Sequence, residues 1–536
     1  MAGPRGGCFV SARGSLPDSW TLELNGPGMG SMHRAGLGGL AATLLSLRQK
    51  DAPEGARWAV GGTMITLEAP GALDELVAWV VEEGLAIGDD GLIAFPGLGS
   101  PQPGTRYALQ QALLGTFLQH GRSRKLEKSE RQLVLDPDGE SLPDSYRPMS
   151  SFKHQGVTEE VVEALRTGTT VRITGFFLPG AAEKHPGRTW SRMEVDPHQY
   201  LALAFAPVGC LVFIVRSRAA GIRERYALVI PEVTDLRAYA DLRRKVAGLS
   251  PLALTVASPA DAALQLSLLD DHGVSHARRE GHRFCSVVAL GKQPWAKQQM
   301  TRTKVLEVAP PDEVTRFNYR LVAEGIMEFQ ADRRVQKDGP GTWVATSAAR
   351  GAIAEALAGN QSWWTALTET YRRNSEFRKA VHYARERRGL AKMVEKAKWE
   401  REDEKLFVEA CHAAMRALYG SIGGRTTAAG TDFSLKAATE MTKIRSSLLR
   451  AKNADSFRDV LLDFWARASR SKVRSNPVLR RTPPGEQVPV WERILPLLDD
   501  EHWRKGRDLA LLALISYSGS DEEEELVAEA ESLESA

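Results

Sequence analysis

Proline is absent from residues 346–476, although the whole chain of 536 residues contains 27 prolines. β-Branched residues are also scarce there, and apolar side chains such as Phe457, Leu461 and Phe464 recur at helical spacing. Proline interrupts helix interiors and β-branched residues favour strands, so a stretch poor in both favours long amphipathic helices. We therefore expect a helical bundle over residues 346–515.

The sequence before this stretch has a different pattern, in which short runs rich in valine and isoleucine alternate with amphipathic runs and with glycine and proline. The expected strands cover residues 20–24, 63–67, 171–178, 200–215 and 225–230, and the expected helices cover residues 33–47 and 73–83, with another amphipathic segment within 107–126. The predicted fold class is α+β, with an N-terminal mixed α/β domain followed by a C-terminal α-helical bundle.

The ends of the chain differ in composition from both domains. The first 19 residues carry glycine, proline and serine without periodicity, and residues 521–536 hold eight acids and no base. Such composition is typical of segments that bury no core. The predicted organisation is a flexible extension over 1–19, an α+β domain over 20–345, a basic helical bundle over 346–515 and an acidic disordered tail over 516–536.

Several broad classes of protein are disfavoured by composition. The longest apolar runs fall short of the ~18 to 20 residues that a membrane-spanning helix needs, and the start of the chain has no apolar stretch of signal-peptide length. The four cysteines form no CxxC pair, so neither a zinc ribbon nor a redox motif is visible. We expect a cytoplasmic protein with reduced thiols and no membrane partner.

Positive charge is concentrated in the helical part of the sequence. The net charge of the whole chain is only +3, but residues 361–480 hold 25 lysines and arginines against 14 acids. Within that segment Arg378, Arg385, Arg388, Lys392 and Lys396 advance by seven, three, four and four residues. On one continuous helix they would occupy a sector of about 80°, a basic stripe that could follow a phosphate backbone.

The alternative interpretation is a solvated helix face whose charges are balanced by Glu376, Glu386 and Glu395. Two further basic groups favour the nucleic-acid interpretation, because one helical domain then carries three separate clusters. The candidate nucleic-acid-binding residues of the helical part are Arg378, Arg385, Arg388, Lys392, Lys396, Lys443, Arg445, Arg450, Lys452, Arg470, Lys472 and Arg474.

No motif of catalytic or cofactor chemistry is recognisable. Gly36, Gly38 and Gly39 loosely match a dinucleotide fingerprint, but they lie inside an expected helix, where small residues would let the helix pack closely against a sheet. His272, His276 and His282 lack a recognised ligand spacing and are interpreted as surface or structural residues. We expect no catalytic residues, no metal and no cofactor, and hence no enzyme activity.

Five stretches of the sequence carry a family resemblance. They are GMGSMHRAGLGGL from Gly28, LLGTFLQH from Leu113, FLPG from Phe177, RTKV from Arg302 and KIRSSLLR from Lys443. In this order they resemble the Myxan-type large subunit of type I CRISPR Cascade complexes, a group that includes the fruiting body developmental protein T of myxobacteria. The resemblance extends over most of the chain, although the first 19 residues and the segment after Gly180 depart from the family pattern.

The resemblance implies a non-catalytic subunit of a crRNA-guided surveillance complex in antiviral defence. The implied partners are crRNA, target DNA, other Cascade subunits and a helicase-nuclease, and the implied roles are sensing of the target-adjacent motif, binding of the displaced strand and recruitment of the nuclease. It also implies an association with fruiting-body development and sporulation. A stand-alone metal-dependent nuclease and a developmental regulatory scaffold remain the alternatives.

One candidate residue lies within the shared N-terminal motif. Arg34 follows a glycine loop at the start of an expected helix, where backbone N–H groups and a permanent cation could hold a phosphate. Conformational glycines with an incidental basic residue would give the same pattern. Arg34 therefore joins the candidate nucleic-acid-binding residues.

Overall fold

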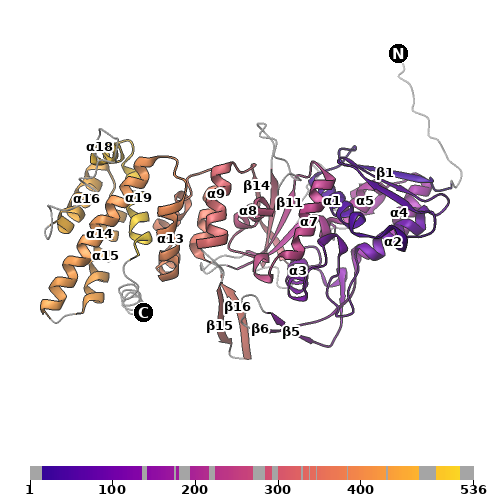
Figure 1. Ribbon diagram of the computed structural model, residues 1–536, viewed down its shortest axis with the longest axis horizontal. Coiled ribbons are helices and arrows are strands. Elements are labelled where there is room, and N and C mark those ends of the chain that lie inside the picture. The colour runs from indigo at the N-terminus through magenta and orange to yellow at the C-terminus, as the bar shows by residue number, and fades with distance from the viewer. Residues whose placement is uncertain are drawn as a thin grey trace, which may run out of the picture. The chain divides into compact units, whose positions relative to one another are not determined.

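The computed structural model describes residues 15–135, 142–173, 177–179, 193–216, 224–269, 284–292, 300–326, 330–336, 339–345, 347–382, 384–429, 432–469 and 490–518. The described chain separates into two compact units. Unit 1 contains the residues up to 310 and the hairpin that follows Gln330, and unit 2 contains residues 311–326 together with the chain from Ala345 onward. Unit 1 mixes strands and helices and unit 2 is helical, which confirms the α+β fold class (Figure 1).

Unit 1 begins with a small antiparallel sheet in the order β1-β3-β2. These strands are β1 (Ser19–Glu23), β2 (Arg57–Val60) and β3 (Met64–Glu68). Two helices accompany them, α1 (Ser31–Ser46) and α2 (Leu73–Gly84). All of the elements expected from the sequence in this region are present, because apolar residues alternate in the strands and recur every three to four residues in the helices.

The larger sheet of unit 1 has five strands in the order β12-β10-β11-β13-β14. Only the β10–β12 pair is parallel, and the remaining pairs are antiparallel. Residues 227–231 and 284–291 are buried without alternation, so both faces of the central strands are covered. The strands are β10 (Leu211–Val215), β11 (Glu224–Pro231), β12 (Thr255–Val256), β13 (Cys285–Lys292) and β14 (Met300–Val308).

Short hairpins and further helices complete unit 1. The paired strands are β4 (Arg124–Leu126) with β7 (Met149–Phe152), β5 (Arg131–Leu135) with β6 (Leu142–Tyr146), β8 (Val171–Ile173) with β9 (Met193–Val195), and β15 (Gln330–Gln336) with β16 (Gly339–Ala345). The helices are α3 (Pro103–Gly115), α4 (Thr158–Thr167), α5 (Pro197–Ala204), α6 (Ala206–Gly209), α7 (Leu236–Arg244) and α8 (Pro259–Leu269).

The strand expected over residues 200–215 is wrong in its first part. Residues 197–209 form α5 and α6, and only Leu211–Val215 is a strand. Asp196 precedes α5 and Pro197 is its first residue, a helix start that the apolar composition obscured. The backbone N–H of Asp196 donates to Gln199 Oε1 at 3.0 Å, which fixes this start.

The glycines of α1 allow close contact with other helices. A Cβ at Gly36 would lie 2.0 Å from the carbonyl oxygen of Ala202, and one at Gly39 would lie 2.5 Å from that of Phe205. Both carbonyls belong to the α5–α6 segment, and α1 also contacts α7 (Figure 1). The expected close packing is therefore present, but its main partners are helices rather than a sheet.

A buried histidine marks the core of unit 1. His154 is fully buried, and its ring centroid lies 4.7 Å from that of Phe177, 5.8 Å from that of Phe117 and 6.0 Å from that of Phe152. Neither ring nitrogen has a hydrogen-bond partner among the residues that the structure describes. Burial lowers the pKa of His154 to about 3, so the ring is neutral in the folded protein.

His154 should make unit 1 sensitive to acid. The unfolded chain takes up a proton near pH 6.5 and the folded chain only near pH 3, so stability is lost as pH falls below about 6.5. From the two pKa values this residue removes about 2 kcal/mol of the free energy of unfolding between pH 7 and pH 5. Urea unfolding at both pH values tests this: His154→Phe should show a smaller loss than the wild type, and an equal loss would contradict the assignment.

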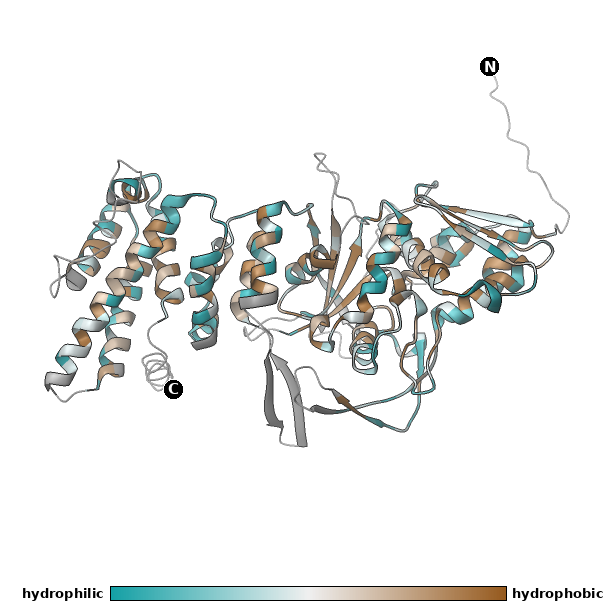
Figure 2. Ribbon diagram, in the orientation of Figure 1, coloured by the Kyte–Doolittle hydropathy of each residue, from teal (hydrophilic) through white to brown (hydrophobic). Residues whose placement is uncertain are grey.

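Unit 2 consists of helices that carry hydrophilic and hydrophobic residues on different sides (Figure 2). None of the described helices is both long and apolar enough to cross a membrane. The helices are α9 (Glu313–Arg320), α10 (Ala348–Ala358), α11 (Thr365–Arg373), α12 (Ser375–Val381), α13 (Ala384–Lys396), α14 (Glu402–Ala429), α15 (Phe433–Arg450), α16 (Ala454–Ser469), α18 (Val490–Ile494) and α19 (Trp503–Ser516).

The apolar repeat expected near the end of the bundle forms the core side of α16. Phe457, Leu461 and Phe464 are buried, and α16 contacts both α14 and α19. Asn453 is the cap of this helix, since its Oδ1 accepts a hydrogen bond from the backbone N–H of Ser456 at 2.9 Å. The predicted tail over 516–536 lies mainly outside the described residues, which end at 518.

Candidate nucleic-acid interface

A row of basic side chains lies on the outer side of α13. Arg388, Lys392 and Lys396 follow each other at intervals of four residues and are exposed, whereas Leu390 and Met393 are buried. Neither Lys392 nor Lys396 has a carboxylate partner within the described part of the chain. We call Arg388, Lys392 and Lys396 the α13 basic row. Its spacing of one helical turn suits contact with successive phosphates.

One of the three acids that could have balanced the expected stripe, Glu386, points away from this row. Glu386 is buried, and its carboxylate accepts hydrogen bonds from the Ser347 hydroxyl at 2.6 Å and from the backbone N–H groups of Ala348 and Ala349 at 3.0 and 3.1 Å. These groups form the N-terminus of α10, whose partial positive charge favours a carboxylate. Glu395 is the acid of α13 that is exposed.

The single continuous stripe expected from Arg378 to Lys396 is wrong, because Arg378 lies on a separate short helix. α12 ends at Val381 and α13 begins at Ala384, so the 100° rotation per residue does not run through both. Arg378 Nη1 donates to the backbone oxygens of Tyr371 and Arg372, each at 3.0 Å, at the C-terminal end of α11. The side chain of Arg385 lies outside the described residues.

The predicted cluster of Lys443, Arg445, Arg450 and Lys452, on α15 and just after it, divides into three environments. Lys443 pairs with Glu440 at 2.9 Å, and this acid partly neutralises it. Arg450 and Lys452 are exposed and have no carboxylate partner among the described residues. Arg445 turns toward His382 instead of lying on the same outer surface.

Arg445 belongs to a cluster that includes residues not singled out from the sequence. Arg445 Nη1 lies 3.0 Å from His382 Nε2, and Arg387 Nη2 lies 2.7 Å from His382 Nδ1. The hydroxyl of Tyr371 lies 3.2 Å from His382 Nε2. No glycine or proline marks the break between α12 and α13, so the sequence offered no signal that these side chains would meet.

The electrostatic environment of His382 is positive. Burial lowers its pKa well below the ordinary value, and the guanidinium groups of Arg387, Arg445 and Arg378 lower it further. We call His382, Arg378, Arg387 and Arg445 the His382 cluster.

Arg34, the N-terminal candidate, has partners inside unit 1. Its Nη1 donates to the backbone oxygen of Met29 at 2.7 Å, and its Nη2 forms an ion pair with Glu232. Ser31 Oγ donates to the same carboxylate at 2.9 Å. The guanidinium therefore joins the start of α1 to the end of β11, and a phosphate would have to compete with Glu232 for it.

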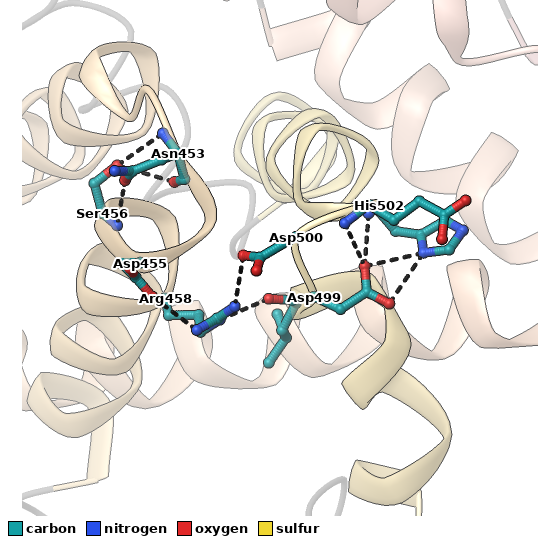
Figure 3. A network of polar contacts seen from close by, with 9 residues as sticks. Asn453, Asp455, Ser456, Arg458, Asp499, Asp500 and His502 are labelled. Atoms are coloured by element: carbon teal, nitrogen blue, oxygen red, sulfur yellow. Dashed lines mark hydrogen bonds and ion pairs between the residues drawn. The ribbon is translucent and has the colours of Figure 1, made fainter.

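Arg458 shows how tertiary contacts can neutralise a basic side chain in unit 2. Its Nε donates to the backbone oxygen of Leu498 at 2.7 Å, and its Nη1 and Nη2 contact Asp455 at 2.8 Å and Asp500 at 3.1 Å (Figure 3). Asp499, beside it, accepts a hydrogen bond from the backbone N–H of His502 at 2.6 Å. Arg458 thus ties α16 to the turn before α19 rather than offering a free charge.

Some candidates lie outside the described residues. These are Arg470, Lys472 and Arg474 among the basic residues, and His272, His276 and His282 among the histidines. In the ranges that the structure does describe, no group of three or more His, Cys, Asp or Glu side chains could hold a metal ion.

Two of the stretches that carried the family resemblance meet in the core of unit 1. Phe117 and Phe177, from two of those stretches, both pack against His154. The loop before α1 is joined to α5, because Gln199 Nε2 donates to the backbone oxygen of Pro27 at 3.1 Å. The fold therefore has one mixed unit and one helical unit, and the α13 basic row lies on the helical one.

Comparison with known proteins identifies the family. The model described as the DevT N-terminal domain matches residues 21–204, and the model described as the DevT C-terminal domain matches residues 395–535. The chain is 30% identical, over 94% of its own length and 90% of the relative's, to the CRISPR-associated protein Cas8a1/Csx13 of Myxococcus xanthus (strain DK1622). The chain belongs to the DevT family of type I CRISPR-associated large subunits.

Proposed function

We propose that this protein is the non-catalytic large subunit of a crRNA-guided surveillance complex, and that its helical unit binds the backbone of a nucleic acid strand. The observation that carries the binding role is the α13 basic row, where Lys392 and Lys396 are exposed and free of carboxylate partners in the described chain. Such charges attract phosphates without reading sequence, while base pairing with a guide supplies specificity.

The subunit's proposed partners are crRNA, target DNA, the other Cascade subunits and a helicase-nuclease. Its proposed tasks are sensing the target-adjacent motif, holding the displaced strand and recruiting the nuclease. Family membership supports this assignment, and a role in fruiting-body development and sporulation is proposed on the same basis.

Charge reversal on α13 tests the binding role. The double variant Lys392→Glu and Lys396→Glu should weaken binding of single-stranded DNA by at least about tenfold at low salt and reduce the salt dependence of the affinity. Fluorescence anisotropy over a salt series would measure both quantities.

Glu395 provides the matched control on the same helix. It is exposed beside the row, so Glu395→Lys should strengthen binding at low salt, since it adds a positive charge to the same surface. If neither variant changes the affinity, α13 is not part of the interface. Turnover of the DNA by the wild-type chain in the presence of a divalent metal would contradict the non-catalytic assignment.

The assembly itself is tested by affinity purification from the native cell. Repeat-derived guide RNA and other CRISPR-associated subunits should be recovered together with the protein, as sequencing and mass spectrometry would show. Recovery of the chain without either would contradict its proposed place in the complex.

A further inference from the structure

His382 is contacted by more hydrogen-bond donors than a neutral imidazole can accept from. Guanidinium nitrogens lie 2.7 Å from Nδ1, at Arg387, and 3.0 Å from Nε2, at Arg445. A neutral imidazole has one acceptor nitrogen and one N–H, and guanidinium groups only donate. His382 can therefore accept from one of these two arginines but not from both, so one donor faces an N–H group.

The cluster also carries positive charge that no acid balances at two of its three arginines, Arg378 and Arg445, within the described residues. Arg378 donates only to backbone oxygens, and Arg445 contacts the neutral groups of His382 and Thr442. Neither has a carboxylate partner anywhere in the described ranges. The guanidinium groups of Arg387 and Arg445 contact the two nitrogens of one imidazole ring, and like charges at such short range repel one another unless an anion lies among them.

We propose that the His382 cluster binds one phosphate group of a nucleic acid backbone. Arg378 and Arg445 would donate to its non-bridging oxygens, the N–H of His382 would donate as well, and the buried Arg387 would donate to the other ring nitrogen of His382. Arginine suits this ligand because its planar fork matches two phosphate oxygens at once. The cluster is accessible to a strand, since Arg378, His382 and Arg445 are only partly buried.

This inference deepens the proposed function and rests on it for the source of the phosphate. The α13 basic row offers charges on an open helix surface, whereas the His382 cluster offers converging donors that fix one phosphate in position. Charges of the first kind supply affinity, and a site of the second kind would set the register of the bound strand.

Inorganic phosphate is the first probe, applied to the full chain at constant ionic strength against chloride. Phosphate should raise the melting temperature of the wild type, and Arg445→Gln should abolish that rise. Arg425→Gln is the control, because Arg425 is exposed on α14, outside the cluster and outside the candidate binding residues, and it should keep the rise. Arg445→Lys keeps the positive charge but lacks the planar guanidinium, so it should retain part of the phosphate-induced rise in melting temperature.

Single-stranded DNA is the second probe. Arg445→Gln should weaken its binding about tenfold, the effect of losing one charge-assisted hydrogen bond, while Arg425→Gln should weaken it less. The site is overturned if phosphate does not stabilise the wild type more than chloride does, or if it stabilises Arg445→Gln equally.

The two probes separate failure of the site from failure of the proposed function. If Arg445→Gln abolishes the phosphate effect but leaves DNA affinity unchanged, the cluster takes free phosphate and its assignment to nucleic acid is overturned. If the double reversal on α13 leaves DNA affinity unchanged while phosphate still acts through Arg445, the proposed interface fails and the phosphate site stands.

Discussion

Replacing Glu386 by alanine is expected to lower the free energy of unfolding of unit 2 by about 3 kcal/mol. The substitution leaves the Ser347 hydroxyl and the backbone N–H groups of Ala348 and Ala349 without their buried acceptor. It also removes the negative charge at the start of α10. Urea unfolding followed by circular dichroism would measure the loss, and hydrogen exchange should show the amides of α10 losing protection first.

Two further variants test whether the loss comes from the hydrogen bonds of Glu386. Glu395→Ala, on the same helix but exposed, should change stability by no more than about 0.5 kcal/mol. Glu386→Gln keeps the size of the side chain and one acceptor oxygen, so its loss should fall between those of the two alanine variants. If Glu386 instead balanced the basic surface, Glu386→Ala would leave stability unchanged and raise nucleic-acid affinity.

Replacing Gly36 by alanine is expected to destabilise unit 1 by about 3 kcal/mol or more. The added Cβ would lie 2.0 Å from the carbonyl oxygen of Ala202, which is backbone and cannot move aside as a flexible side chain could. The helices α1 and α5 would have to separate, and the core between them would lose contact. Thermal and urea unfolding would measure the loss in the unfolding transition of unit 1.

Gly420 provides the matched control for this prediction. It lies within α14, and a Cβ there would meet no atom within 4 Å. Gly420→Ala should therefore stabilise the protein by about 0.5 to 1 kcal/mol, since alanine is the better helix former. If Gly36→Ala did not lower the free energy of unfolding either, the glycines of α1 would not serve close packing. Their resemblance to a dinucleotide fingerprint would then have to be tested by a ligand-binding assay.

The error at residues 200–209 shows where local patterns mislead. A run of alanine, leucine and phenylalanine is buried on all sides in α5 and α6, so it lacks the alternation of polar and apolar residues that separates helix from strand. The helix start at Asp196 and Pro197 was the available signal. Burial in the core of unit 1 removed the periodicity on which the prediction depended.

The helical character of the second unit and the outward position of Arg388, Lys392 and Lys396 follow from the sequence, because helical periodicity depends only on neighbours along the chain. The direction of Glu386, the internal pairing of Arg34 and the meeting of Arg387 and Arg445 at His382 were decided by the tertiary structure. A charged side chain takes its partner from whichever element packs beside it, and in these cases that element is a different helix or strand. Spacing along one helix carries no information about that partner.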